Sequence, residues 1–271
     1  MNEPFKALVA RKESDNISLA VENMSIDDLS PGEVVVKVAY SSVNYKDGLA
    51  CDPKSRVARS YPLIPGIDLT GTVMQSEDGR FRAGDEVLVT GYGLGVSHSG
   101  GFSELARVPA DWIVPVPAGL TMRECMIIGT AGFTAALSVQ KLQLNGLTPE
   151  QGPVLVTGAT GGVGSMAVSI LAKLGYSVTA STGKEAEHDY LKGLGASEVI
   201  GRDEWIDASD KPLLKEKMGR HRGSCRRPNI GERSEDDKVR RSRRIQRINR
   251  GNGTDGDSVS VYFAGSEFAG G

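Results

Sequence analysis

The sequence predicts an α/β protein in which a β-rich, partly open barrel is followed by a doubly wound parallel sheet. Two observations support this fold class. Short apolar or alternating segments, separated by Gly, Pro and acidic residues, fill residues 1–120. From residue 153 onward, a strand, a glycine-rich turn, a helix and a second strand follow one another. Closely spaced short strands indicate a barrel, whereas strands that alternate with helices indicate a parallel sheet.

The first part is expected to contain three clear strands. Residues 32–40 form an apolar run after a glycine, and residues 71–75 and 85–90 alternate or run apolar between turn residues. Segments of this kind are typical of strands. Residues 120–147 instead place Met, Ile, Ala, Val and Leu at helical spacing, which predicts helical structure before the second part.

The second part has the element order βαβαβ. The expected elements are a strand at 154–156, a helix at 165–174, a strand at 177–181, a helix at 184–194 and a strand at 197–200. This order is the first half of a Rossmann-type dinucleotide-binding sheet.

The glycine-rich turn after the first of these strands predicts a binding site for a dinucleotide. Its candidate residues are Thr160, Gly161, Gly162, Val163 and Gly164. The free N–H groups of the following helix would face a pyrophosphate, and the helix dipole favours its negative charge. Glycines permit the tight turn, the approach of the backbone to the phosphates and the close packing of helix on strand. The alternative is an ordinary glycine-rich turn in an α/β domain.

The end of the next strand predicts NADP(H) as the cofactor. An enzyme that selects NAD usually carries Asp or Glu there, to bond the ribose hydroxyls. This chain has Thr182, Gly183 and Lys184 instead. The lysine would attract a 2′-phosphate and the threonine could donate a hydrogen bond to it, whereas a carboxylate would repel it.

The composition points to a globular protein of a reducing compartment. The chain has 271 residues, 39% of them hydrophobic and 24% charged, with only three cysteines and three histidines. The cysteines are far apart, so they indicate neither a disulfide framework nor a zinc cluster. No secretory signal and no apolar run of about 20 residues is apparent. We therefore expect a cytoplasmic protein with no membrane association.

The last part of the sequence differs sharply in charge from the rest. Residues 1–217 hold 20 Lys and Arg against 27 Asp and Glu, whereas residues 218–271 hold 12 against 7. Eleven of the 19 arginines fall between residues 220 and 250. We expect this Arg-rich tail to be disordered or the product of a reading-frame shift near residue 217, because it shows no apolar periodicity. The alternative is a nucleic-acid-binding arm.

Several motifs resemble the medium-chain dehydrogenase/reductase superfamily, in its zinc-independent quinone oxidoreductase branch and its acryloyl-CoA reductase group. The matching text includes SSVNYKDGLA (41–50), YPLIPGIDLTGTV (61–73), GTAGFTAALSV (129–139) and VTGATGGVGSMAVSILAKLGY (156–176). The resemblance covers about residues 1–217. It implies a GroES-like catalytic domain over residues 1–123, a Rossmann NADP-binding domain over 124–217 that is incomplete, and a homodimer.

The resemblance also bears on zinc. Zinc-dependent members carry a cysteine where this chain has Asn44, a histidine where it has Ile67, and a second cysteine near residues 130–132, where none stands here. Amide and alkyl side chains cannot form a tetrahedral N/S site. We therefore expect no metal. For Asp47 and Asp68 we expect structural hydrogen-bond acceptor roles rather than ligand roles.

The resemblance implies further site residues. Tyr45 is the candidate catalytic residue and also reaches the cofactor beside the nicotinamide. The alternative is a tyrosine that packs the cleft wall. Thr130 is expected to line the nicotinamide pocket, and Arg202 to lie on the adenosine side unless it is simply a solvated loop residue. For His98, in a glycine-rich loop, a surface-loop role is expected rather than a catalytic one.

The resulting hypothesis is a zinc-independent, NADPH-dependent reductase that adds hydride to the C=C bond of an unsaturated thioester such as acryloyl-CoA. One alternative is an NADPH:quinone oxidoreductase with the same machinery. An alternative of another class is a catalytically weak dinucleotide-binding protein whose basic tail contacts RNA. Because the family's chain continues beyond the part matched here, we expect weak NADPH binding and poor turnover from this chain.

Overall fold

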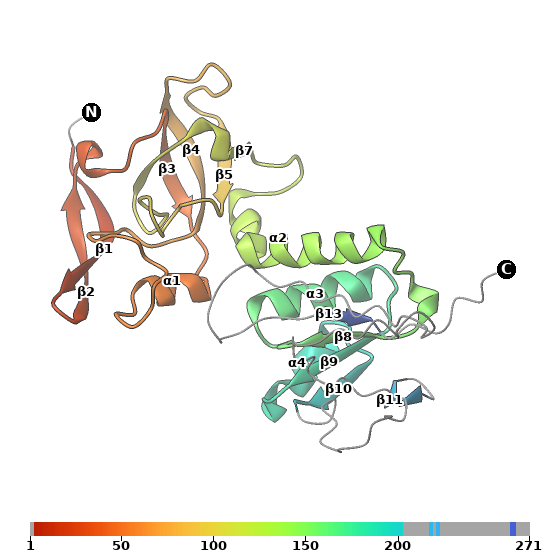
Figure 1. Ribbon diagram of the computed structural model, residues 1–271. Coiled ribbons are helices and arrows are strands. Elements are labelled where there is room, and N and C mark those ends of the chain that lie inside the picture. The colour runs from red at the N-terminus through yellow and green to blue at the C-terminus, as the bar shows by residue number, and fades with distance from the viewer. Residues whose placement is uncertain (1–2, 203–216, 219–220, 223–260, 264–271) are drawn as a thin grey trace, which may run out of the picture. The chain divides into compact units, whose positions relative to one another are not determined.

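The computed structural model describes residues 3–202, 217–218, 221–222 and 261–263 (Figure 1). The chain divides into two compact units, residues 1–133 and 134–271. Each unit has its own hydrophobic core. The α/β fold class is confirmed. The domain limits at residues 123 and 217 stay predictions.

The first unit begins with a β-hairpin. Strands β1 (Phe5–Glu13) and β2 (Asn16–Met24) pair antiparallel from Phe5↔Met24 to Glu13↔Asn16. Ser14 supplies the left-handed backbone of the turn, with φ 56°. One face of β1 is buried with Leu29 and Ile64 in a small apolar cluster. The hairpin is therefore anchored by β1, while much of β2 stays exposed.

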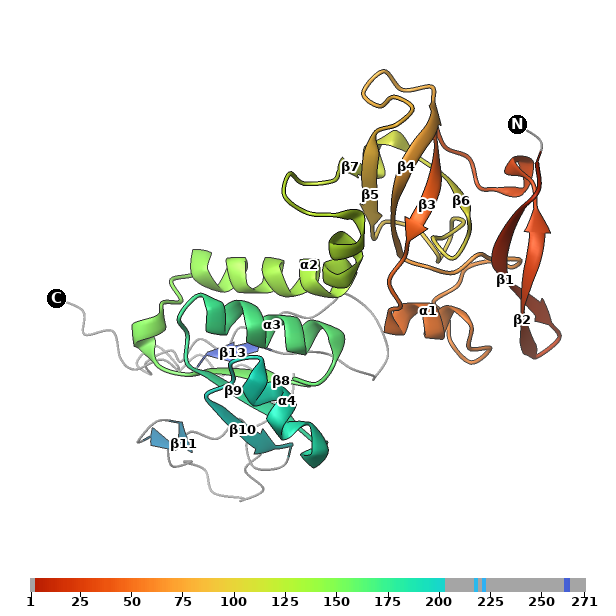
Figure 2. The same cartoon turned by 180° about the vertical axis from the view of Figure 1, so that it is seen from behind.

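The rest of the first unit is built on a five-stranded antiparallel sheet (Figure 2). The strand order is β6-β3-β4-β5-β7, with bounds β3 Val34–Tyr40, β4 Asp68–Ser76, β5 Glu86–Thr90, β6 Leu105–Val108 and β7 Ile113–Pro115. Alternate valines and leucines of these strands form one core with Phe81 and Leu94. The three predicted strands thus correspond to β3, β4 and β5.

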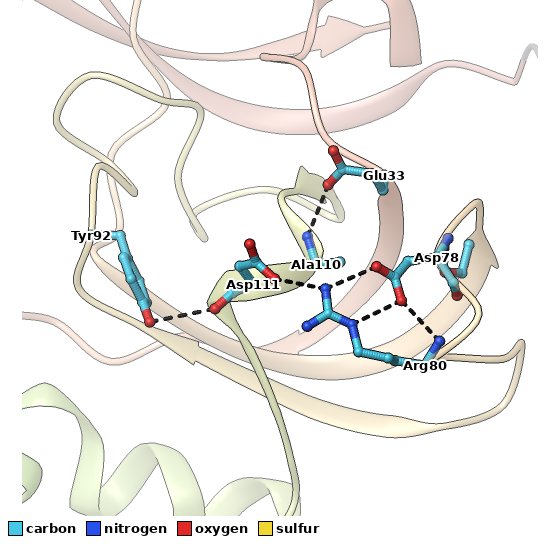
Figure 3. Close-up of polar contacts among 7 residues, drawn as sticks. Glu33, Asp78, Arg80, Tyr92, Ala110 and Asp111 are labelled. Carbon is cyan, nitrogen blue, oxygen red and sulfur yellow. Dashed lines mark hydrogen bonds and ion pairs between the residues drawn. The ribbon is translucent and has the colours of Figure 1, made fainter.

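Polar contacts fasten a turn and a short helix at the rim of this sheet (Figure 3). Arg80, in the turn after β4, bonds both carboxylate oxygens of Asp78 at 2.8–2.9 Å and reaches Asp111 at 2.7 Å. Asp111 lies in the 3-10 helix Ala110–Trp112. The backbone N–H of Ala110 donates to Glu33 at 3.0 Å.

Helix α1 (Tyr45–Ala50) follows β3, and helix α2 (Met122–Leu144) spans the boundary between the units. α2 is long and apolar enough to cross a membrane, with a mean hydropathy of 1.3, which we had not expected. However, half of that apolar window is buried, and Ala135, Val139 and Leu142 belong to the core of the second unit. α2 is thus a core helix in this structure.

The second unit contains a four-stranded sheet of order β10-β9-β8-β13. Strands β8 (Val154–Thr157), β9 (Val178–Thr182) and β10 (Glu198–Gly201) are parallel. Helix α3 (Gly162–Lys173) connects β8 to β9. The 3-10 helix Glu185–Glu187 and helix α4 (His188–Gly193) connect β9 to β10. Another 3-10 helix, Pro149–Gln151, precedes β8. The predicted βαβαβ order is observed.

Helix boundaries differ from the predictions. α3 begins at Gly162, three residues earlier than expected, because Gly161 serves as its N-cap in extended conformation. Glycines have low helix propensity, so periodicity alone places the start too late. The helix expected at 184–194 begins instead as a 3-10 turn and becomes α-helical at His188.

Most of the Arg-rich tail lies outside the described residues. Two-residue strands β11 (Lys217–Met218) and β12 (His221–Arg222) pair antiparallel. Strand β13 (Val261–Phe263) pairs antiparallel with β8 from Val261↔Val156 to Phe263↔Val154. The sequence indicated no strand there. The reason for this difference is that the second edge of β8 offers unpaired backbone groups to any extended segment.

Candidate functional site

The turn between β8 and α3 is shaped by close backbone packing. Gly158 has φ 61°, and a Cβ on Gly164 would lie 2.3 Å from the Gly158 carbonyl oxygen and 2.8 Å from the Ala159 Cα. No side chain fits there without moving backbone. This is the close approach of helix and strand that the sequence predicted for a glycine in this turn.

The N-terminus of α3 has the properties of an anion site. The helix has 12 residues. Its first turn, which is fully described, has no side-chain cap and no acidic residue. Gly161 and Gly162 are exposed, and Thr160 and Val163 are partly buried. The first N–H groups of a helix have no intrahelical partner, and the dipole adds positive charge to them. Phosphate oxygens suit such an end.

The carboxyl ends of β9 and β10 bring the other predicted cofactor residues together. The buried Thr182 hydroxyl lies 3.3 Å from the Thr160 hydroxyl and accepts the Lys184 backbone N–H at 3.1 Å. A Cβ on Gly183 would stand 3.6 Å from the Arg202 guanidinium. The exposed Lys184 and Arg202 therefore flank Gly183 with two positive charges. Hydroxyls, cations and helix N–H groups together would suit a phosphorylated dinucleotide.

In the first unit, a buried carboxylate organises the predicted catalytic segment. Asp68 is 0% exposed and accepts hydrogen bonds from Ser42 and Thr130, each through its backbone N–H and its hydroxyl, at 2.6–3.0 Å. The Asn44 side-chain amide donates a fifth bond at 3.0 Å. These five donors satisfy the oxygens of a carboxylate that is fully buried.

Gly129 makes this arrangement possible. Its backbone is not helical, with φ 52° and ψ −164°, and a Cβ there would lie 2.7 Å from the Ser42 hydroxyl oxygen. The break in α2 leaves both the N–H and the hydroxyl of Thr130 directed at Asp68. The predicted nicotinamide-pocket residue is thus held by hydrogen bonds within the first unit.

A second buried carboxylate, Asp47, caps α1. It accepts the backbone N–H of Asn44 at 2.7 Å, of Ile67 at 3.0 Å and of Gly66 at 3.2 Å. Burial raises the pKa of the Asp47 carboxyl above its ordinary value, and the charge of Asp68 adds to this, while the three N–H groups oppose it. Both aspartates are therefore hydrogen-bond acceptors in the structure, as expected.

Tyr45 is the first residue of α1 and follows the N-cap Asn44 directly. The residue is 60% exposed, so it is accessible to a ligand. Ser42, which joins Asn44 to Asp68, is a site residue that was not predicted from the sequence. Its only signal was a hydroxyl two residues before Asn44 in the SSVN motif. The catalytic and cofactor roles of Tyr45, Thr130 and the residues of the second unit stay predictions.

His98 corrects one expectation. Its ring is 9% exposed rather than on the surface. The Nε2 atom lies 2.9 Å from the Pro31 carbonyl oxygen, and the ring packs edge-on against Trp112 at 4.9 Å. Trp112 stacks on Tyr92 in turn. The loop folds back over its own aromatic neighbours, so His98 has a packing role that its glycine-rich surroundings did not indicate.

Comparisons with known proteins agree with this architecture. Residues 30–118 match the alcohol dehydrogenase GroES-like domain. The chain is 56% identical over 216 residues to the putative quinone oxidoreductase YhfP of Bacillus subtilis, covering 80% of this chain and 66% of that relative. It is 52% identical over 214 residues to the acrylyl-CoA reductase AcuI of Ruegeria pomeroyi, covering 78% of this chain and 65% of that relative.

Solved structures show the same similarity. The B. subtilis YhfP structure with NAD bound has a TM-score of 0.77, with 80% of this chain and 66% of that one covered. The yhdH oxidoreductase from Salmonella enterica in complex with NADP is 51% identical, has a TM-score of 0.74, and is matched over 78% of this chain and 64% of its own. The chain thus spans about two thirds of the length of these relatives. The matched residues, with their GroES-like domain and Rossmann-type sheet, belong to the medium-chain dehydrogenase/reductase superfamily.

Proposed function

We propose that this protein is an NADPH-dependent reductase that adds hydride to the C=C bond of an α,β-unsaturated thioester such as acryloyl-CoA. The observation that carries the proposal is the edge formed by α3, β9 and β10. There, the Arg202 guanidinium lies beside Gly183, Lys184 is the next residue, and the Thr160 and Thr182 hydroxyls are 3.3 Å apart. An NAD-selective protein usually carries a carboxylate at this strand end instead. The R. pomeroyi relative, which is named an acrylyl-CoA reductase, supports the substrate class.

The residues of the chain would divide the work in two. The helix N–H groups of residues 161–164, Val163 included, would hold the pyrophosphate with Thr160 beside them. Lys184 and Arg202 would hold the 2′-phosphate. When bound, the reduced nicotinamide supplies the hydride. Tyr45 would donate a hydrogen bond to the thioester oxygen as negative charge develops there during hydride addition to the β-carbon. A proton from solvent water then adds to the α-carbon and completes the reduction. Thr130, held by Asp68, shapes the nicotinamide pocket.

The proposal includes no zinc. Asn44 stands where zinc-dependent relatives are expected to carry a cysteine, and its amide donates to Asp68. Ile67, at the expected histidine position, is a buried alkyl side chain. This donor set does not suit a tetrahedral zinc ion. Polarisation of the substrate would fall to hydrogen-bond donors such as Tyr45. We also propose that the protein is a homodimer and that it is cytoplasmic. Light scattering coupled to size-exclusion chromatography tests whether it is a dimer.

Initial rates with two cofactors and two acceptors test the function. We expect NADPH to be oxidised with acryloyl-CoA faster than with a benzoquinone, and NADPH to be preferred to NADH. Lys184→Ala should raise the KM for NADPH by roughly tenfold, the equivalent of one charge-assisted hydrogen bond, and leave that for NADH unchanged. The control is Lys173→Ala, an exposed lysine at the far end of α3.

The second candidate function is quinone reduction, which the printed name of the B. subtilis relative favours. Turnover with the quinone and none with acryloyl-CoA would replace the first proposal with this one. NADPH binding without turnover of either acceptor would point to a binding protein instead.

A further inference from the structure

A basic groove lies in the first unit, away from the residues considered so far. It encloses about 770 Å³ between the turn end of the β1–β2 hairpin and the segment 53–62. Its charged lining residues are Arg11, Lys12, Glu13, Lys54, Arg56 and Arg59. Five of these six are cations, so the groove is strongly positive although the whole chain has a net charge of −2.

Most of this positive charge is available to a ligand. Arg11 is engaged, since its guanidinium forms two bonds of 2.7 and 2.8 Å with Glu22. Lys54, Arg56 and Arg59 are exposed, and the described part of the chain places no carboxylate within ion-pair distance of them. The cations outnumber the one carboxylate among the described lining residues, Glu13, and repel one another, so an anion between them relieves that repulsion.

The loop that presents these cations is held by hydrogen bonds. The Lys54 N–H donates to the Asp52 carboxylate at 2.9 Å, and the Ser55 N–H donates to the Asp52 carbonyl at 3.0 Å. The Arg59 backbone N–H donates to the Val96 carbonyl at 3.1 Å. The Tyr61 hydroxyl donates to the carbonyl of Ala50, the last residue of α1, at 2.8 Å. The loop is thus tied to the helix that begins at Tyr45, about 9 Å away along the six residues of α1.

We propose that this groove binds the phosphate groups of the coenzyme A part of the substrate. This inference rests on the proposed reductase function. Coenzyme A carries a pyrophosphate and a 3′-phosphate at the far end of a long, flexible pantetheine arm from its thioester. Arg56 and Arg59 can bond phosphate oxygens in pairs, and Lys54 adds a compact charge. A groove one short helix from Tyr45 would anchor the nucleotide while the acyl end reaches the phenol.

The groove would also set acceptor specificity. A quinone carries no phosphate and gains nothing from these cations, whereas an acyl-CoA gains binding energy far from the reacting bond. Neutralising the cations of the groove should therefore weaken the binding of acyl-CoA and leave the binding of small uncharged acceptors unchanged.

Direct binding tests the groove independently of turnover. Free coenzyme A is titrated calorimetrically into the full chain, with NADP⁺ present to fill the dinucleotide site. The triple variant Lys54→Gln, Arg56→Gln, Arg59→Gln should bind coenzyme A roughly 10- to 100-fold more weakly, since each exposed charge contact contributes modestly. A matched triple variant of exposed cations elsewhere, Lys37→Gln, Arg82→Gln and Arg123→Gln, should bind as the unmodified protein does.

Kinetics separates the groove from the proposed function. With the acryloyl thioester of N-acetylcysteamine, which lacks phosphates, the groove variant should turn over as the unmodified protein does. With acryloyl-CoA its KM should rise by the same factor as its Kd for coenzyme A. Equal affinity for coenzyme A in both triple variants would overturn the assignment of the groove. It would not contradict the proposed reductase function, which the oxidation of NADPH tests separately. Displacement of coenzyme A by equimolar inorganic pyrophosphate would also overturn it, in favour of a general anion groove.

Discussion

At the scale of single residues, the Asp68 carboxylate holds the predicted catalytic segment together. It is fully buried and accepts five hydrogen bonds from Ser42, Asn44 and Thr130. Asp68→Ala would leave these donors without an acceptor, so we expect the free energy of unfolding to fall by about 3 kcal/mol or more. Urea denaturation measures this. Asp27→Ala, which removes an exposed aspartate outside this network, should lower the free energy of unfolding far less. Equal losses in the two variants would contradict the role given to Asp68.

Two aspartates should respond to pH with opposite signs. Burial raises the pKa of Asp47 above its ordinary 3.8, so its contribution to stability falls as the pH rises through the window above 3.8. The Arg80 guanidinium lowers the pKa of Asp78 to about 2, so its contribution is present above 3.8 and is lost as the pH falls towards 2. Denaturation of Asp47→Asn and Asp78→Asn between pH 2 and 7 should show these opposite trends against the unmodified protein. Parallel trends would refute the assignment.

At the scale of elements, the contact between α3 and the preceding turn decides whether the proposed dinucleotide-binding edge of α3, β9 and β10 can form. Gly164→Ala places a Cβ against backbone atoms of Gly158 and Ala159, so α3 must move away from β8. We expect a loss of about 1–3 kcal/mol in stability and weaker NADPH binding. Gly193→Ala is the control, because a Cβ at that helical glycine in α4 meets nothing within 4 Å. Fluorescence titration with NADPH and urea denaturation would reveal whether the two variants differ.

At the scale of the whole molecule, the separate cores predict separate unfolding. Leu171 is fully buried in the core of the second unit, and Val89 in that of the first. Leu171→Ala should cost about 2–5 kcal/mol in its own unit and leave the amide exchange of β3, β4 and β5 unchanged. Val89→Ala should have the converse pattern. Hydrogen exchange measured by mass spectrometry follows both variants. If either substitution lowers amide protection in both units, the units unfold as one.

The sequence was informative where a pattern is local. An apolar run rich in valine located β3, and the glycines after Val156 located the turn before α3. The hairpin of β1 and β2 was not singled out because β2 is largely exposed and its alternation is weak. The Asp68 network was beyond sequence reasoning, since 62 residues separate Asp68 from Thr130 and only the fold joins them. The basic groove combines charges from two distant segments in the same way.

The backbone of Gly129 has a consequence for how relatives of this chain can diverge. Its φ and ψ of 52° and −164° lie at the edge of a region that is almost closed to residues with a Cβ. A side chain there would also displace the Ser42 hydroxyl, which Asp68 needs as a donor. Positions 42, 68, 129 and 130 should therefore be inherited as a set. A descendant that loses the glycine should also have replaced the carboxylate or the hydroxyl that the glycine admits.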